Sequence, residues 1–231
     1  MRARQDTCVC IIGARAGSKR VPGKNRLLVG GVPLYRNAVE AALGSGVCTP
    51  TILTTDDVLI QQDLAGHGEL LVDERPSHLA GSSPSMWDVV EDMMRRRPKL
   101  FEQGGAIMLL TPCHPFRTAY HVRMAFEQFR ASGADALVSV TAYPFPPELR
   151  LSVNNNRVTR DWDGLVRAGD HLVSYYPNGA VTILTQEAFM THRSPYTGNT
   201  TAFEISWPEC LDIDEPGDLE LARRLIDSGV V

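Results

Sequence analysis

The chain has 231 residues, of which 43% are hydrophobic, and this is enough for one sizeable domain with a buried core, so a disordered chain is excluded. A formal net charge of −4 excludes a general nucleic-acid binder, because such proteins carry strongly basic surfaces. No apolar run approaches the roughly 20 residues of a membrane span, and the first residues lack the apolar core of a signal peptide. We therefore expect a cytoplasmic protein with no membrane contact.

The first half of the chain alternates between short apolar runs and amphipathic stretches. The predicted elements are a strand at 8–13, a helix at 32–46, a strand at 50–57, a short helix ending near Gly66, a strand at 69–74 and a helix at 84–97. Ser83 stands where the N-cap of the last helix is expected. A basic loop, 13–26, lies between the first strand and the first helix.

The second half continues the alternation with one interruption. The predicted elements are a strand at 104–112, a helix at 118–133, a strand at 135–143, a strand at 178–185, and a strand running into a helix within 209–229. Between them, residues 143–176 contain prolines, an asparagine run and short strand-like pieces, which indicate an inserted arm. Strands that are apolar throughout predict a mostly parallel, doubly wound α/β sheet in a single domain, 1–231.

The loop 13–26, GARAGSKRVPGKNR, carries five positive charges, three glycines and no acidic residue. A loop after the first strand of a parallel sheet lies at the edge where such sheets bind ligands, so its charges and glycines predict a polyphosphate site. It is not a P-loop, because five residues separate Gly17 from Gly23 and Asn25 follows Lys24. On composition alone, a solvated basic loop remains the alternative.

The second candidate group is Asp212 and Asp214, placed on either side of Ile213 near the end of the chain. In an extended segment, alternate residues share one face, so both carboxylates can reach one hard cation such as Mg²⁺. The alternative is that Asp214 caps the last helix and Asp212 is solvated. A basic loop together with this acidic pair favours the site for nucleotide and metal.

Four segments occur in the order and at about the separations of one enzyme family. They are IIGARAGSKRVPGKN (11–25), LLTPCHPFRTAYHVRMAF (109–126), YYPNGAVTI (175–183) and LDIDEPGDLELA (211–222). Over nearly its whole length the chain resembles the cytidylyltransferases that make CMP-activated sugar acids, the CMP-N-acylneuraminate synthetases. The resemblance implies a Rossmann-like domain with an inserted dimerisation arm, hence a homodimer. It also implies a Mg²⁺-dependent reaction in which an acceptor oxygen attacks the α-phosphorus of CTP and pyrophosphate leaves.

The resemblance further implies roles for individual residues. Arg15 and Lys24 would clamp the triphosphate, while Asp212 and Asp214 would hold Mg²⁺, and these four form the expected catalytic set. The other expected nucleotide-binding residues are Ala14, Gly17, Ser18, Lys19 and Asn25 in the loop, with Arg75 and Ser85 near the cytosine. The expected acceptor-binding residues are Thr111, His114, Arg117, Arg167, Tyr176 and Asn178.

The acceptor half departs from the family pattern. Thr111 stands where sialic acid enzymes usually have Gln, and Tyr176 stands where an Arg often precedes the NGA segment. Two acceptors therefore stay open: a sialic-type 2-keto-3-deoxy sugar acid, and a small phosphonic acid of the kind that relatives activate in natural-product pathways, which cationic side chains such as Arg117, Arg150, Arg167 or His114 could bind. A nucleotide-binding regulatory protein without turnover, and a transferase that uses another nucleoside triphosphate, are further alternatives.

Overall fold

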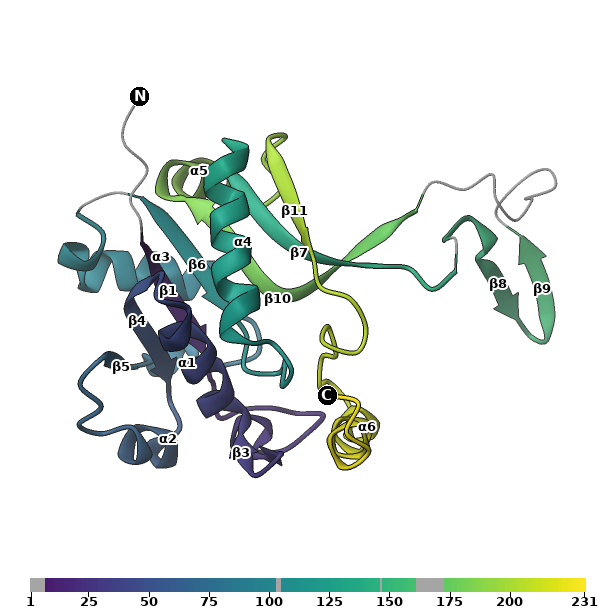
Figure 1. Ribbon diagram of the computed structural model, residues 1–231, viewed down its shortest axis with the longest axis horizontal. Helices are drawn as coiled ribbons and strands as arrows, with labels where there is room; N and C mark the ends of the chain where they lie inside the picture. Colours follow the sequence, from purple (N-terminus) through teal and green to yellow (C-terminus); the bar gives the residue numbers. More distant parts are fainter. Residues whose placement is uncertain (1–6, 103–104, 146, 161–172) are drawn as a thin grey trace.

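A seven-stranded sheet forms the centre of the molecule (Figure 1). The structure is a computed structural model and describes residues 7–102, 105–145, 147–160 and 173–231. The strands of the sheet are β1 (Cys8–Gly13), β4 (Cys48–Thr55), β5 (Leu70–Glu74), β6 (Ala106–Leu110), β7 (Ala136–Ala142), β10 (Tyr175–Thr185) and β11 (Thr200–Glu204). Their order is β11-β7-β10-β6-β1-β4-β5, and every pairing is parallel except those of β10 with β6 and β7. The predicted mostly parallel sheet is confirmed.

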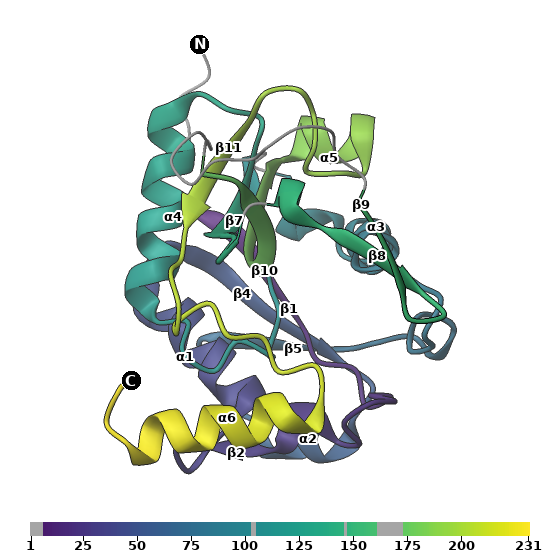
Figure 2. The same cartoon turned by 90° about the vertical axis from the view of Figure 1, so that its right-hand side faces the viewer.

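Helices cover both faces of this sheet. The helices of the described residues are α1 (Leu34–Ser45), α2 (Val58–Asp63), α3 (Met86–Arg96), α4 (Ala119–Ser132), α5 (Gln186–His192) and α6 (Pro216–Asp227), of which α6 packs in a separate cluster with Val29 and Leu34 rather than on the sheet. Helices α1 and α4 lie on one face of the sheet, and α3 and α5 lie on the other (Figure 2). Their buried side chains form the two core clusters on these faces. The central strands are apolar throughout because both of their faces are covered, which is the doubly wound arrangement.

Local sequence explains where the main helices begin and end. Gly46 and Gly133 follow α1 and α4 with φ of +73° and +71°, the left-handed conformation that ends a helix. The N-cap of α3 is Ser85 rather than the expected Ser83, because Ser85 forms a capping box with Asp88. The helix therefore begins two residues later than expected, and Pro84 precedes its N-cap.

Two predictions for the C-terminal part were wrong. Strand β11 was missed, since its residues TTAFE are only partly buried at the sheet edge and give a weak hydrophobic signal. Residues 211–214 are not a strand: the hydrogen bond from the Ile213 amide to the Cys113 carbonyl, 2.9 Å, does not continue into a ladder. The expected alternation holds, since Ile213 is fully buried between the two less buried aspartates.

Within the predicted arm, the described residues contain a hairpin of β8 (Leu151–Asn154) and β9 (Arg157–Arg160), which lies well away from the central sheet (Figure 1). Asn155 and Asn156 both have positive φ, as a two-residue turn that matches the twist of a hairpin requires. A second small hairpin, β2 (Leu28–Val29) with β3 (Val32–Pro33), contacts α6. The remaining elements are short 3-10 helices: η1 (Lys24–Arg26), η2 (Ser77–Leu79), η3 (Pro98–Leu100) and, in the arm, η4 (Pro147–Leu149).

The parallel strands bring several loops to one edge of the sheet. The segments that follow β1, β4, β5, β6 and β11 all start at the carboxyl ends of these strands, and the antiparallel β10 begins at the same edge. Strands β4 and β6 lie on opposite sides of β1 in the sheet, so the strand order reverses at β1. The crevice between β1 and β6 is the switch point at which such sheets bind ligands. No helix in the described ranges is both long and apolar enough to span a bilayer.

Candidate active site

The basic loop after β1 lines a cavity of about 370 Å³ at this switch point. Its lining residues are Gly13, Arg15, Ser18, Lys19, Arg20, Lys24, Asn25, Thr111, Pro112, Cys113 and Asp214. The loop therefore lies opposite the segment that follows β6 and the C-terminal aspartate. Four of the lining side chains are cationic, which makes the cavity suited to an anion with several charges.

The loop is held in shape by side chains as well as by backbone turns. The Asn25 amide donates to the Arg15 carbonyl at 2.9 Å, and the Ala16 amide donates to Asp56 Oδ1 at 2.8 Å. Gly23 has a φ of +65°, which only glycine adopts without strain. Of the other expected loop residues, Ala14 is fully buried with its amide bonded to the Thr54 carbonyl, and its contact with a nucleotide stays a prediction.

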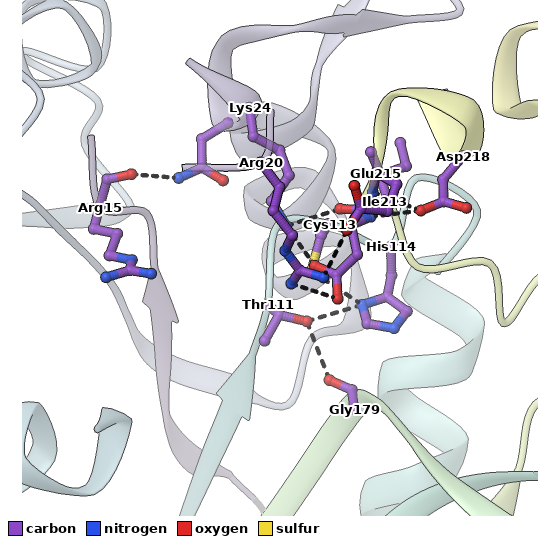
Figure 3. Close-up of polar contacts among 12 residues, drawn as sticks. Arg15, Arg20, Lys24, Thr111, Cys113, His114, Gly179, Ile213, Glu215 and Asp218 are labelled. Carbon is purple, nitrogen blue, oxygen red and sulfur yellow. Dashed lines mark hydrogen bonds and ion pairs between the residues drawn. The ribbon is translucent and has the colours of Figure 1, made fainter. Parts of the chain in front are cut away.

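Lys24 and Arg20 join the loop to the C-terminal segment (Figure 3). The Lys24 ammonium donates to the Ile213 carbonyl at 2.8 Å and lies 3.1 Å from Asp214 Oδ1. Arg20 Nη2 lies 2.9 Å from Asp214 Oδ2. Partial burial alone would raise the pKa of Asp214, but the hydrogen bonds and charges of Lys24 and Arg20 outweigh it and lower that pKa. Asp214 is therefore an ionised carboxylate.

Asp212 lies in a different environment. Its Oδ1 is buried without a hydrogen-bond partner, and burial raises the pKa of its carboxyl group. The Cys113 thiol, a His114 ring nitrogen and an Asp212 oxygen lie within 4.8 Å of one another, and burial raises the pKa of Cys113 to about 12, so that thiol stays protonated. Mg²⁺ is commonly held by one or two carboxylates together with substrate phosphates and water. An unpartnered oxygen of Asp212 and the ionised Asp214, two residues apart, are donors of this kind, although the two residues line different cavities.

A second cavity, of about 240 Å³, shares Gly13 and Arg15 with the first. Its other lining residues are Arg75, Ser82, Pro84, Ser85, Met86 and Val89. A Cβ on Gly13 would lie 2.5 Å from Met86 Sδ, so the junction between the two cavities has no room for a side chain at this position. Arg75 is 5% exposed and donates to the Thr54 carbonyl, while its Nε has no partner. Ser85 is engaged in the α3 capping box, and its contact with cytosine stays a prediction.

The expected acceptor residues after β6 hold two strands together. His114 is 1% exposed, and its Nε2 donates to the Asn178 carbonyl at 2.8 Å, so its Nδ1 accepts from the Thr111 hydroxyl at 2.8 Å. That hydroxyl also lies 3.1 Å from the Gly179 carbonyl (Figure 3). Burial, followed by the charge of Arg117, lowers the pKa of His114 to about 3. His114 is therefore neutral at physiological pH.

Arg117 acts in the same clamp. Its Nη1 donates to the carbonyls of Thr111 and Ala180 at 2.8 and 2.9 Å, its Nε and Nη2 are buried without partners, and burial lowers its pKa to about 10. Asn178 completes the clamp through bonds with Ser139 and Thr141. Direct contact of His114 and Arg117 with an acceptor stays a prediction, and their contacts favour a positioning role. Arg167, the remaining expected residue, lies outside the described residues.

A third cavity, of about 290 Å³, adjoins Asp212. Its lining residues are Tyr176, Pro177, Asn178, Trp207, Cys210, Leu211 and Asp212. Trp207 is 56% exposed, and neither it nor Arg20 nor Glu215 was singled out from the sequence as a site residue. In the sequence Arg20 is one of five similar loop charges, and nothing in the pattern around Trp207 predicts that the loop after β11 returns to the site.

Known proteins resemble this chain over most of its length. Residues 9–228 match the family model of the cytidylyltransferases. The chain is 28% identical over 215 residues to N-acylneuraminate cytidylyltransferase of Streptococcus agalactiae serotype V, covering 91% of this chain and 51% of that protein. It is 29% identical over 224 residues to CMP-N,N'-diacetyllegionaminic acid synthase of Legionella pneumophila, covering 95% and 96%. The chain thus spans about half the length of the streptococcal relative.

The solved structures agree on the fold. CMP:2-keto-3-deoxy-manno-octonic acid synthetase, solved in complex with CTP, superposes with a TM-score of 0.68 at 18% identity, covering 96% of this chain and 99% of that one. Similarity at this level of identity shows the fold. The doubly wound, Rossmann-like architecture expected from the sequence is therefore confirmed by a solved structure as well as by strand order.

Proposed function

The chain belongs to the cytidylyltransferase family, and from this premise we propose that it transfers CMP from CTP to a 2-keto-3-deoxy sugar acid with release of pyrophosphate. The observation that carries the proposal is the cavity in which the basic loop after β1 meets the C-terminal Asp214. A triphosphate and its counter-cation need both signs of charge at one place, and four cationic side chains face Asp214 across this cavity.

The nucleotide takes the two joined cavities in this proposal. Arg15, Lys19 and Lys24 contact the triphosphate, because they line the larger cavity with cationic groups. The base takes the smaller cavity beside Arg75, which Gly13 and Arg15 connect to the larger one. Fixed cations that face the β- and γ-phosphates stabilise the charge that develops on departing pyrophosphate, which is the largest contribution such a site makes to the rate.

The chemical step is a single displacement at phosphorus. The acceptor hydroxyl oxygen forms a bond to the α-phosphorus of CTP, the bond from that phosphorus to the oxygen bridging to the β-phosphorus breaks, pyrophosphate leaves with the bonding electrons, and the hydroxyl proton goes to solvent. Asp212 and Asp214 would hold Mg²⁺, which when bound supplies charge neutralisation at the phosphates. The remaining task of the protein is to align the acceptor with the phosphorus.

The third cavity is the acceptor site in this proposal. It adjoins Asp212, and Tyr176 and Trp207 offer it two aromatic rings, whereas none of its described lining residues is cationic. Aromatic faces suit the apolar face of a sugar ring, while a phosphonate dianion requires cationic partners. This composition favours a sugar acid. The relatives named above also take sugar acids, by the names they carry.

Pyrophosphate release tests the proposal. CTP, UTP, GTP and ATP are each offered with Mg²⁺ and with sialic-type acids, 3-deoxy sugar acids and small phosphonates. Release with CTP and a sugar acid supports the proposal. Release only with a phosphonate assigns the alternative acceptor, release with another nucleotide overturns the choice of base, and tight CTP binding without release from any acceptor points to a regulatory protein.

The proposal includes a homodimer and a cytoplasmic location, where CTP is available. The hairpin of the arm supports the dimer, because Leu151, Val153 and Val158 are at least half exposed, and Val153 and Val158 are paired on one face of the hairpin. An exposed apolar face on a projecting hairpin is stable when a partner covers it. Val153→Asp is expected to shift the molar mass measured by light scattering from dimer to monomer. A wild-type protein that is itself monomeric would remove the dimer from the proposal.

A further inference from the structure

Arg20 makes contacts that the proposed reaction does not use. One nitrogen of its guanidinium, Nη2, lies 2.9 Å from Asp214 Oδ2, and the other, Nη1, lies 3.2 Å from Glu215 Oε1 (Figure 3). Lys24 occupies Asp214 Oδ1 at the same time. Both oxygens of the aspartate that would hold a cation are therefore engaged by cationic side chains of the phosphate-binding loop.

The charges around the cavity oppose a lone cation. Arg15, Lys19, Arg20 and Lys24 line it, and Asp214 is the carboxylate among its described lining residues. A divalent cation that arrives without a nucleotide meets this positive field and must also displace Arg20 from Asp214. A nucleoside triphosphate reverses the balance, because its phosphates attract the same cations.

The Arg20 contacts are suited to release. The side chains of Arg20 and Asp214 are 57% and 42% exposed, and exposed ion pairs are weak because water screens them. The Arg20 side chain also remains anchored by Glu215 when Asp214 leaves it. Lys24 is more buried, at 16% exposure, and its second bond goes to the fixed Ile213 carbonyl. Of the two cationic side chains that contact Asp214, Arg20 is thus the one that can exchange Asp214 for another anion.

We infer that Arg20 is a positioning residue that holds Asp214 while the site is empty and releases it to a divalent cation only when the phosphates of a nucleotide take over the guanidinium. Cation binding at Asp214 is thereby coupled to nucleotide binding, and a cation without nucleotide binds more weakly. This inference rests on the proposed function, since it assumes that Asp214 is a cation ligand and that the loop binds a triphosphate.

The experiment measures Mn²⁺ affinity by electron paramagnetic resonance, with and without CTP and with no acceptor present. The wild type is expected to bind Mn²⁺ weakly alone and at least about tenfold more tightly with CTP, a typical size for coupling between sites. In Arg20→Gln, Mn²⁺ alone is expected to bind about five- to tenfold more tightly than in the wild type, so the effect of CTP on Mn²⁺ affinity shrinks accordingly.

Lys19→Gln is the matched control. It removes the same charge from the same cavity, but the contacts of Asp214 are with Arg20 and Lys24, so its effect on Mn²⁺ alone is expected to be under about twofold. The inference is overturned if both variants change the affinity for Mn²⁺ alone equally. It is also overturned if the ratio of Mn²⁺ affinities with and without CTP is the same in Arg20→Gln as in the wild type. Failure of the proposed function gives a different result: the wild type releases no pyrophosphate with any acceptor, while the Mn²⁺ titrations still decide the role of Arg20.

Discussion

The ammonium of Lys24 lies 3.1 Å from Oδ1 of Asp214, although 190 positions separate the two residues in the sequence. The same ammonium donates to the Ile213 carbonyl. One side chain of the first crossover loop therefore fixes where the C-terminal segment lies, and the segment carries the only two aspartates expected to bind a cation. Loss of Lys24 is therefore expected to affect both the charge that faces the phosphates and the position of Asp214.

Lys24→Ala is expected to lower kcat/KM for CTP by on the order of 10²- to 10³-fold, because it removes a charge aimed at the phosphates and loosens Asp214. Steady-state rates and calorimetric titration with CTP measure the effect. Arg26→Ala is the control: Arg26 belongs to the same loop, but it pairs with Asp57 at 2.9 Å outside the cavity, and its loss is expected to change kcat/KM less than about threefold. Similar losses in the two variants would contradict the assignment of Lys24.

Asp212→Asn is expected to abolish turnover and to stabilise the protein. Burial raises the pKa of Asp212 and its Oδ1 has no partner, so the ionised carboxylate at neutral pH opposes folding. A neutral amide removes that penalty, and the free energy of unfolding in urea should rise by about 0.5–2 kcal/mol. Activity should fall at least about 100-fold, as for lost metal-site interactions. A variant that is less stable but active would remove Asp212 from the cation site.

The parts of the site that the sequence predicted are those carried by short, local patterns. The basic loop after the first strand and the Asp-Ile-Asp alternation both depend on neighbours in the chain: the loop lines a cavity, and Ile213 is buried between two less buried aspartates, although these residues do not form the expected strand. The antiparallel direction of β10 and the edge strand β11 depend on pairing between distant segments, which periodicity does not encode.

His114 and Arg117 illustrate the same limit at the level of chemistry. In the sequence, both residues are candidate cations for binding an acidic acceptor. In the fold they are almost fully buried, and one is neutral, because the start of β10 folds over them and their nitrogens bond to the carbonyls of Asn178, Thr111 and Ala180. Whether a polar side chain binds a ligand or bonds to the backbone depends on which segments pack over it. Those segments are set by the tertiary structure.

His114 is expected to make the protein sensitive to acid. Its pKa is about 3 in the folded protein and about 6.5 in an exposed chain, so the unfolded state takes up a proton first as pH falls. The stability it contributes is complete above about pH 6.5 and is lost toward pH 3, at about 1.4 kcal/mol per pH unit. In His114→Gln, urea unfolding between pH 7.5 and 4.5 should show a slope shallower by about that amount. Parallel pH profiles for the two proteins would show that His114 titrates normally.

Trp207→Ala is expected to raise KM for the acceptor by about tenfold and to leave KM for CTP within about twofold. The reason is geometric: Trp207 and Tyr176 line the cavity beside Asp212, but neither lines the two cavities assigned to the nucleotide. Trp207→Phe keeps an aromatic face and is expected to recover most of the affinity for a sugar acid. If Trp207→Ala instead changes KM for CTP, or if the alanine and phenylalanine variants behave alike, the ring does not contact the acceptor. A phosphonate acceptor has no sugar ring. If a phosphonate is turned over and its KM is unchanged in Trp207→Ala, that result would also argue against the sugar acid assignment.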